Sequence, residues 1–396
     1  MTESRQEPVL ASTSPRQPFV ADDVLLLGPG PSTVSTRVRE AMLQPLLGHL
    51  DPQFTALMDR VQDDVRLAFA TAHPFTLVLP ATGTGGMEAT LSTTIEPGDR
   101  VVVAVSGYFG ERMRDIATRV GGDVVEVRAE PGRAVEADAV IAAMRAGPTR
   151  VVAMVHAETS TGVLQDPLPI ALVAREVGAL VVLDCVTSLG GVAVELDAWG
   201  IDAAYSCSQK CLGAPPGLSP VSLSPRAERK LAARARHPSS FYFDPALLAA
   251  YWGPQRLYHH TAPVSTFYAL AAALDEVAAE GLPARWARHR EVAQALARGL
   301  EALGLVLLVP PQQRAPMLTT VLVPEETDDA AVRARLRQRH RIEVGGGLGA
   351  LRGRVWRVGL MGHGARPAHV ERLLVALGEE LQRDPADALA AARLDG

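Results

Sequence analysis

The stretch Leu180-Val-Val-Leu-Asp184 is a continuous apolar run that ends on an acid. An uninterrupted run of this kind is typical of a strand buried on both faces of a sheet. Similar runs recur along the chain, with amphipathic helical patterns between them. The predicted strands cover residues 76–79, 100–105, 124–128, 150–156, 180–184, 203–206 and 221–224, and the predicted helices cover 86–95, 111–120, 137–145 and 169–177. This alternation predicts an α/β fold whose mostly parallel sheet is covered by helices on both faces.

The C-terminal part of the chain has a different pattern. Residues 264–303 are Ala-rich and helical, with a break at Gly281-Leu-Pro283. Strand patterns follow at 305–309, 319–323 and 355–359, and a closing helix is expected from 367 to about 383. We therefore expect an N-terminal arm (1–22), a large domain (23–281) and a smaller C-terminal α+β domain (282–396).

Composition narrows the function classes. The formal net charge is −5 and no basic run occurs, which argues against nucleic acid as a partner. No apolar stretch reaches the length of a membrane span, and the first twenty residues lack the apolar core of a signal peptide. The three cysteines have no second Cys/His pair at zinc-site spacing, so no metal site is expected. These features predict a soluble, cytoplasmic protein.

Lysine is rare in this chain, since only Lys210 and Lys230 occur among 39 Lys and Arg residues. Unlike arginine, a lysine amine can lose its proton and form a Schiff base. Lys230 lies in a charged helical pattern, whereas Lys210 lies in the uncharged segment Tyr205-Ser-Cys-Ser-Gln-Lys-Cys-Leu-Gly213. A chemical use of Lys210 would explain its retention, and an arginine-favouring codon bias is the alternative.

Asp184 gives Lys210 a partner. An acid at the C-terminal end of a parallel strand lies where open α/β sheets bind ligands, although many such acids only cap helices. One further predicted strand separates Asp184 from Lys210. An aspartate that holds a pyridine nitrogen protonated and a lysine that forms an imine are the pair that a pyridoxal phosphate enzyme needs.

A phosphate site is predicted at Pro80-Ala-Thr-Gly-Thr-Gly-Gly-Met-Glu88, which follows a strand and opens a helix. Small residues allow backbone N–H groups to approach an anion, and a helix N-terminus favours negative charge. The dinucleotide fingerprint fails because Glu88 stands where its last glycine would be, and the Gly-Lys-Ser/Thr of a Walker loop is missing.

Together these segments resemble the class V pyridoxal phosphate aminotransferases, specifically the alanine–glyoxylate / serine–pyruvate aminotransferase family. The resemblance extends from residue 25 to the end of the C-terminal domain. The segments that carry it are Leu25-Leu-Leu-Gly-Pro-Gly-Pro-Ser32, Ser106-Gly-Tyr-Phe-Gly-Glu-Arg112, His156-Ala-Glu-Thr-Ser-Thr-Gly162, Asp184-Cys-Val-Thr-Ser-Leu-Gly-Gly191, Ser208-Gln-Lys210 with Ala214-Pro-Pro-Gly217, Tyr258-His-His-Thr261 and Arg354-Val-Trp-Arg-Val-Gly359. It implies fold type I, with a large sheet domain and a smaller C-terminal domain.

The resemblance also implies roles for single residues. Lys210 would form the Schiff base with the cofactor and move the substrate Cα proton, and Asp184 would pair with the pyridinium nitrogen. Arg357 would bind the substrate α-carboxylate, with Gly30 beside the substrate. The other cofactor contacts would be Thr82, Gly83, Thr84 and Gln209 at the phosphate, Thr159 at the 3-hydroxyl side of the ring, Phe109 stacked on the ring, and Tyr258 and Thr261 reaching the phosphate from the neighbouring subunit of a homodimer. Phe109 replaces the tryptophan that is common in the family, so stacking is retained without an indole N–H.

The implied reaction is ping-pong transamination from alanine or serine to glyoxylate or pyruvate. A ureidoglycine–glyoxylate aminotransferase shares the acceptor and is the main alternative. A cysteine desulfurase-like lyase needs a mobile loop cysteine, and no cysteine follows Cys211. A cofactor-binding regulator without turnover is disfavoured by the combination of Lys210, Asp184 and Arg357.

Some reactive side chains have simpler interpretations. His156 is expected to be a packed strand-end histidine rather than a general base. Cys207 and Cys211 fit buried small residues as well as redox sensors. The adjacent His259 and His260 side chains are expected to diverge.

Overall fold

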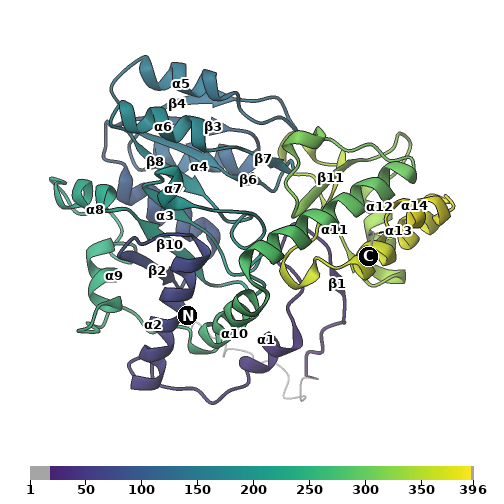
Figure 1. The fold of residues 1–396 in the computed structure, drawn as a ribbon, viewed down its shortest axis with the longest axis horizontal. Helices are drawn as coiled ribbons and strands as arrows, with labels where there is room; N and C mark the ends of the chain where they lie inside the picture. The colour runs from purple at the N-terminus through teal and green to yellow at the C-terminus, as the bar shows by residue number, and fades with distance from the viewer. Residues whose placement is uncertain (1–17, 394–396) are drawn as a thin grey trace, which may run out of the picture.

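The structure is a computed structural model that describes residues 18–393, so most of the predicted N-terminal arm lies outside the described residues. A seven-stranded sheet forms the centre of the larger part of the molecule (Figure 1). Its spatial order is β2 (Phe75–Leu79), β10 (Ser219–Leu223), β9 (Ala203–Tyr205), β8 (Leu180–Asp184), β5 (Thr149–Val155), β3 (Arg100–Val105) and β4 (Asp123–Arg128). All neighbours from β9 to β4 are parallel, and β10 alone among the seven runs antiparallel. The predicted mostly parallel sheet is confirmed.

Helices cover both faces of this sheet. Helix α3 (Gly83–Thr94) packs against α4 (Tyr108–Arg119), and α5 (Ala137–Arg145) packs against α6 (Leu168–Glu176). The connections through α3 and α4 lead toward the β4 edge, whereas those through α5 and α6 lead away from it. Since parallel crossovers are right-handed, the two helix pairs lie on opposite faces. Every residue of β8 is therefore buried, which explains its apolar sequence.

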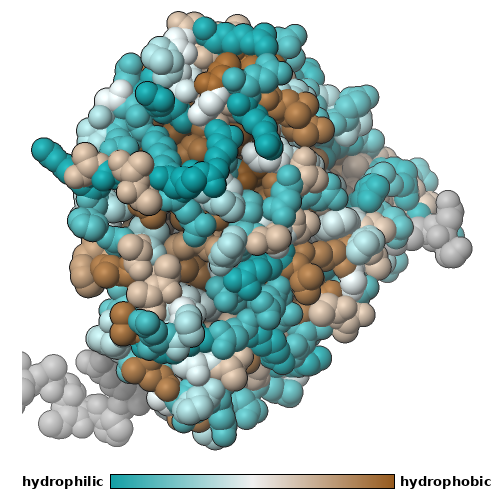
Figure 2. All heavy atoms as spheres, turned by 60° about the vertical axis from the view of Figure 1, so that its left-hand side comes forward, coloured by the Kyte–Doolittle hydropathy of each residue, from teal (hydrophilic) through white to brown (hydrophobic). Residues whose placement is uncertain are grey.

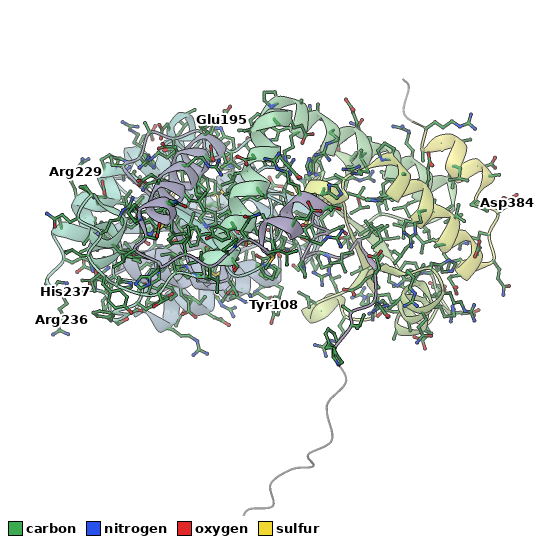
Figure 3. The ribbon with its side chains drawn as sticks, turned by 90° about the horizontal axis from the view of Figure 1, so that it is seen from below. Tyr108, Glu195, Arg229, Arg236, His237 and Asp384 are labelled. Carbon is green, nitrogen blue, oxygen red and sulfur yellow. The ribbon has the colours of Figure 1, made fainter. Side chains whose placement is uncertain are left out.

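A second hydrophobic cluster lies in the C-terminal part. It surrounds a three-stranded sheet in the order β11 (Leu318–Leu322), β14 (Val355–Gly359) and β13 (Gly345–Gly346). The helices of this part are α11 (Leu282–Ala302), α12 (Asp329–Arg339), α13 (Pro367–Leu381) and α14 (Ala386–Ala391). Figure 3 shows the two parts from below, with Arg229 and His237 at the far end of the larger part and Asp384 at the end of the smaller one.

The N-terminal segment crosses from one part to the other. Strand β1 (Leu25–Leu26) pairs in parallel with β12 (Ile342–Glu343), and Leu25 and Leu27 are buried in the C-terminal cluster. Residues 25–27, which were predicted within the large domain, have their backbone and side-chain partners in the C-terminal part. The predicted boundary at 281/282 falls between α10 (Val264–Glu280) and α11.

One predicted strand is not formed. Residues 305–309 contribute only an isolated bridge between Leu307 and Val321, although Leu308 N and Leu322 N donate to the facing carbonyls. Gly304, with φ of +75°, precedes the segment and Pro310 follows it, so the pairing is too short to continue. The remaining described α-helices and strands are α1 (Thr36–Ala41), α2 (Pro52–Ala68), α7 (Leu196–Trp199), α8 (Pro225–Ala232), α9 (Pro245–Trp252), β6 (Ala157–Glu158) and β7 (Val163–Leu164).

Hydrophobic patches break up the largely hydrophilic side of the molecule in Figure 2. Large apolar side chains are exposed on two stretches, 42–50 and 241–258. The stretches meet where the rings of His49 and Tyr258 lie 5.4 Å apart. We refer to the exposed side chains of Met42, Leu43, Leu46, Leu50, Phe241, Tyr242, Leu257 and Tyr258 as the apolar face. Within residues 18–393, no helix is both long and apolar enough to cross a membrane.

Candidate active site

A cavity of about 170 Å³ opens at the C-terminal ends of the parallel strands. Eight of the residues predicted for the cofactor site line it together: Thr82, Gly83, Thr84, Phe109, Thr159, Asp184, Gln209 and Lys210. The other lining residues, which were not predicted, are Met87, Arg112, Val155, Ala157, Val186 and Thr187. The cavity lies where open parallel sheets place their ligands.

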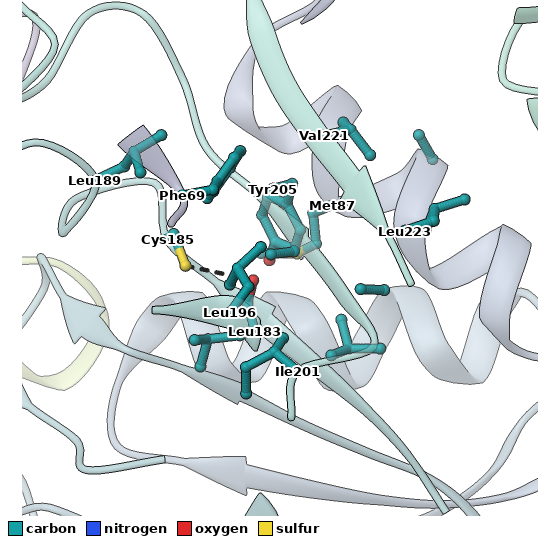
Figure 4. Packing of buried hydrophobic residues seen from close by; sticks show 14 of the residues in the cluster. Phe69, Met87, Leu183, Cys185, Leu189, Leu196, Ile201, Tyr205, Val221 and Leu223 are labelled. Atoms are coloured by element: carbon teal, nitrogen blue, oxygen red, sulfur yellow. Dashed lines mark hydrogen bonds between the residues drawn. The ribbon is translucent and has the colours of Figure 1, made fainter. Parts of the chain in front are cut away.

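Asp184 ends β8, and its side chain is buried. Its Oδ2 accepts a hydrogen bond from Tyr205 Oη (2.7 Å), and its Oδ1 accepts one from Val186 N (2.8 Å). Burial raises the pKa of Asp184 to about 6, against the lowering effect of these two donors. Figure 4 shows Tyr205 packed among apolar side chains that include Met87 and Val221. Tyr205 lies in a segment quoted for Lys210, but its contact with Asp184 was not predicted.

Lys210 follows β9 in a loop and is 8% exposed. Burial lowers the pKa of the Lys210 amine, which favours the neutral form that a nucleophile or base requires. The Nζ donates to the Pro29 carbonyl. At Gly30, where φ is +115°, a side-chain carbon would lie 2.6 Å from Lys210 Cε. The positive φ and the close approach to the lysine side chain both favour glycine at position 30.

The N-terminus of α3 forms an anion cradle. Thr82 is its N-cap and accepts from Gly85 N, and α3 itself begins at Gly83. A side-chain carbon at Gly83 would lie 2.9 Å from Val186, so the backbone is as close to its neighbours as glycine permits. Gln209 lines the cavity beside the cradle, and its buried Oε1 has no hydrogen-bond partner among residues 18–393. An amide oxygen only accepts, so Gln209 can serve an anion only through its Nε2 donors. The close backbone N–H groups at the start of α3, with the Nε2 donors of Gln209, fit the phosphate of pyridoxal phosphate.

Arg112 joins the cradle to the predicted stacking residue. Its Nη1 donates to Thr84 Oγ1 (2.9 Å), and its guanidinium carbon lies 4.9 Å from the centre of the Phe109 ring. The cation–π contact steadies the ring, and the hydrogen bond holds the threonine. Arg112 ends a segment that carries the family resemblance, but nothing in the local pattern distinguished it from the other arginines.

Glu158 fixes the beginning of α4. Its buried carboxylate accepts from Phe109 N (3.1 Å), Gly110 N (3.1 Å), Ser160 N (3.0 Å) and Ser160 Oγ (2.6 Å). At Gly107, the residue before α4, a side-chain carbon would lie 2.6 Å from Glu158 Cγ. Glu158 thus takes the place of an N-cap residue from a different element, and it holds the backbone of Phe109. Sequence reasoning missed this role.

Arg357 lies on β14 and is not among the residues that line the cavity, but it bonds to one of them. Its Nη1 donates to Thr159 O (3.0 Å), and its Nε donates to Gly346 O (2.7 Å). Burial lowers the pKa of Arg357 to about 10, so the guanidinium is still charged at neutral pH. Arg357 is thereby held beside Thr159, a residue of the cofactor cavity.

Tyr258 and Thr261 do not line the cavity of their own chain, and both are exposed. Tyr258 belongs to the apolar face. A contribution of these residues to a neighbouring subunit stays a prediction.

The simpler interpretations of the other reactive side chains can be compared with the structure. Burial raises the pKa of Cys207 to about 12 and that of Cys211 to about 11, whereas a redox-sensing thiol needs a lowered pKa and exposure. Burial lowers the pKa of His156 to about 4, and its ring packs against Trp199 as expected for a strand-end histidine. The prediction that the two adjacent histidines diverge is wrong, because their Nδ1 atoms lie 2.7 Å apart. Among residues 18–393 there is no cluster of three or more potential metal ligands.

Comparison with known proteins identifies the family. The family model described as aminotransferase class V matches residues 37–357. The chain belongs to the class V aminotransferases. It is thus a pyridoxal phosphate-dependent transaminase of fold type I, as the resemblance implied.

Individual class V relatives match nearly the whole chain. A Drosophila melanogaster alanine–glyoxylate aminotransferase is 37% identical over 372 residues, which cover 93% of this chain and 94% of the relative. The crystal structure of an alanine–glyoxylate aminotransferase from Nostoc sp. is 46% identical, with a TM-score of 0.91 and coverage of 93% of this chain and 98% of that one. The crystal structure of the ureidoglycine–glyoxylate aminotransferase from Bacillus subtilis is 35% identical, with a TM-score of 0.93 and coverage of 95% and 98%.

Proposed function

We propose that this chain binds pyridoxal phosphate in the cavity and transfers the amino group of alanine or serine to glyoxylate or pyruvate. The observation that carries the proposal is the meeting of Lys210 and Asp184 in one cavity with the N-terminus of α3. Arg357, which bonds to the cavity residue Thr159, would supply a charged fork for a substrate carboxylate.

Each residue has a task in this reaction. When bound, pyridoxal phosphate supplies a reactive carbonyl and a ring that accepts electrons. Asp184, in its charged form, stabilises a protonated ring nitrogen. Lys210, whose neutral amine is a nucleophile, would hold the cofactor at its carbonyl carbon and, when released, would move a proton at the substrate Cα. Phe109 would pack on the ring, the α3 N-terminus and Gln209 would hold the phosphate, and Thr159 would bond the 3-hydroxyl side.

The substrate assignment rests on the relatives. Several curated relatives are named alanine–glyoxylate aminotransferase, and the Bacillus subtilis relative is named (S)-ureidoglycine–glyoxylate transaminase. Glyoxylate is common to both names, which supports it as the acceptor. An α-carboxylate is common to alanine and serine, and Arg357 suits it. A panel of single half-reactions with alanine, serine, glycine and ureidoglycine would separate the donors, and activity only with ureidoglycine would move the assignment to that reaction.

We also propose a homodimer in the cytoplasm, in which Tyr258 and Thr261 reach the phosphate of the neighbouring site. The apolar face supports this, because contiguous exposed apolar surface is typical of an interface. The three cysteines are unpaired thiols, which fits a reducing compartment.

The central test compares the two lysines. Borohydride treatment of the protein loaded with pyridoxal phosphate should fix the cofactor to Lys210. Lys210→Ala should abolish both this trapping and turnover. Lys230→Ala is the matched control, because Lys230 lies on α8 and is ion-paired with Asp99 (2.6 Å). This variant should trap the cofactor as wild type does. Protein that gains no visible absorbance band with added cofactor would contradict the proposal.

A further inference from the structure

Two loops of the active site touch at Gly362. Lys210 begins one of them, and the other is the turn that follows β14, the strand of Arg357. At Gly362, where φ is +55°, a side-chain carbon would lie 3.2 Å from Cys211 O and 3.3 Å from Lys210 O. The backbone of the turn therefore packs directly on the loop of the lysine. The contact therefore joins the loop of Lys210 to the segment that follows the strand of Arg357.

Arg285 of helix α11 bonds to the loop of the lysine at this contact. The Arg285 side chain is 4% exposed, and its Nη2 donates to Cys211 O (2.8 Å). Its Nη1 donates to Glu280 Oε2 (2.7 Å) at the end of α10. Arg285 thus holds the loop of the lysine and is itself held by a carboxylate.

Arg288, one turn further along α11, holds the other loop. Its Nη1 donates to Gly362 O (3.1 Å) and to Ala365 O (2.7 Å). Its Nε and Nη2 donate to the two oxygens of Glu280 (2.5 and 2.9 Å). Glu280 is therefore the common anchor of both arginines. Partial burial raises the pKa of Glu280, but hydrogen bonds and charges of Arg288 and Arg285 bring it down to about 2, so the anchor is charged at neutral pH.

His289 completes the group. Because Arg285 O can only accept, His289 Nδ1 donates to it (2.7 Å), and Nε2 is left to accept from Gly362 N (3.0 Å). The ring is fully buried, and burial lowers its pKa to about 3, so this neutral tautomer persists over the working pH range. Gly362 is thus bonded to α11 through both its N–H and its carbonyl.

We propose that Glu280, Arg285, Arg288 and His289 are positioning residues that set the separation between Lys210 and Arg357, and so make the site selective for amines that carry an α-carboxylate. The inference rests on the proposed function. In an α-amino acid one carbon separates the amino group from the carboxylate. The amino group can lie at Lys210 while the carboxylate lies at Arg357 only if the separation of the two residues matches the substrate. Misplacement of a reacting group by about 1 Å can lower the rate on the order of a hundredfold.

Two aminooxy reagents provide a direct test. Aminooxyacetate and O-methylhydroxylamine attack the carbonyl of the bound cofactor through the same nitrogen, but only aminooxyacetate has a carboxylate for Arg357. Wild type should react faster with aminooxyacetate. In Glu280→Gln this preference should fall by at least about fivefold, while the rate with O-methylhydroxylamine stays within about twofold. Glu276→Gln is the matched control. Glu276 lies with Glu280 and the two arginines in a second cavity, but its carboxylate accepts from Ser35 Oγ (2.5 Å) instead.

Hydrogen exchange of the cofactor-free protein gives a second readout. Glu280→Gln should speed exchange of the amides in 210–213 and 362–365 together, and Glu276→Gln should not. If Glu280→Gln fails to fold, Arg288→Lys serves instead, since it keeps the charge and loses the fork. An unchanged preference in a folded variant, or an equal fall with both reagents, would overturn this inference. Wild type that reacts with neither reagent would overturn the proposed function itself.

Discussion

At the scale of single residues, burial controls the charge of the two central side chains. It raises the pKa of Asp184 to about 6 and lowers that of Lys210. Both shifts favour the neutral forms and move the pKa values of the two groups toward neutral pH. A cationic ring nitrogen beside Asp184 would reverse the first shift, since an opposite charge favours the charged form of a carboxyl. The cavity is therefore suited to a cationic partner at this position.

The shift at Asp184 makes stability depend on pH. The pKa in the folded chain, about 6, lies above the ordinary value of 3.8, so the folded state keeps a proton that the unfolded state has lost. This contribution is full below about pH 4 and is lost as the pH rises through 6. The free energy of unfolding of cofactor-free wild type, relative to Asp184→Asn, should fall by about 2 kcal/mol between pH 4 and pH 7.

Chemical denaturation at both pH values measures this difference. Added pyridoxal phosphate should abolish the pH dependence, because a cationic partner favours the charged carboxylate. In the cofactor-free protein, the free energy of unfolding of wild type relative to Asp184→Asn should change with pH. If it does not, the assigned burial of Asp184 is contradicted.

At the scale of elements, the start of α4 depends on a residue from β6. Glu158 accepts from the N–H groups of Phe109 and Gly110, and the Ser160 hydroxyl accepts from Tyr108 N (2.9 Å). These N–H groups begin the helix and have no partner within it. Glu158, at the end of β6, therefore sets the position of the Phe109 ring.

Glu158→Gln should destabilise the fold by about 1–3 kcal/mol, because the amide NH2 would face backbone donors in a buried place. Urea unfolding measures the loss. Glu111→Gln, in the first turn of the same helix, is the control. Glu111 pairs with Arg128 at the surface (2.7 Å), and loss of an exposed pair costs at most about 1 kcal/mol. Equal losses in the two variants would argue against the role of Glu158.

Local patterns predicted the elements that local forces determine. The apolar strand before Asp184 and the glycine-rich start of α3 have their signals within a few residues, and both were found. The pairing of β1 with β12 has no local signal, because two-residue strands from opposite ends of the chain leave no periodicity. Glu158 was missed for a related reason: it acts on a helix that begins about fifty residues earlier. The rarity of lysine and the position of Asp184 indicated a chemical role for Lys210, whereas the role of Arg357 came from the family resemblance alone, since spacing could not bring the two residues together.

At the scale of the whole molecule, Tyr258 and Thr261 require a second chain if they serve the cofactor. They lie outside the cavity of their own chain, and Tyr258 belongs to the apolar face. Each chain then supplies Lys210 to its own site and Tyr258 and Thr261 to the site of its partner. A substitution in one chain can therefore be compensated by a second chain that carries a different substitution.

Mixed dimers test this arrangement. Lys210→Ala and a double variant, Tyr258→Ala with Thr261→Ala, should each be impaired alone. Chains that are unfolded and refolded together should regain activity, because each mixed dimer would have one site with Lys210 from one chain and Tyr258 and Thr261 from the other. No gain over the sum of the separate variants, with dimers present by sedimentation, would show that the two residues act within one chain or not at all.

The pairing of β1 with β12 also determines when the site can be completed during synthesis. Domains generally fold as units while the ribosome is still adding residues. Leu25 has no strand partner until Ile342 has left the exit tunnel, so the segment that holds Pro29 and Gly30 against Lys210 must wait through most of translation. The nascent chain can therefore build its large sheet early, but it gains a finished lysine pocket only near the end of its synthesis.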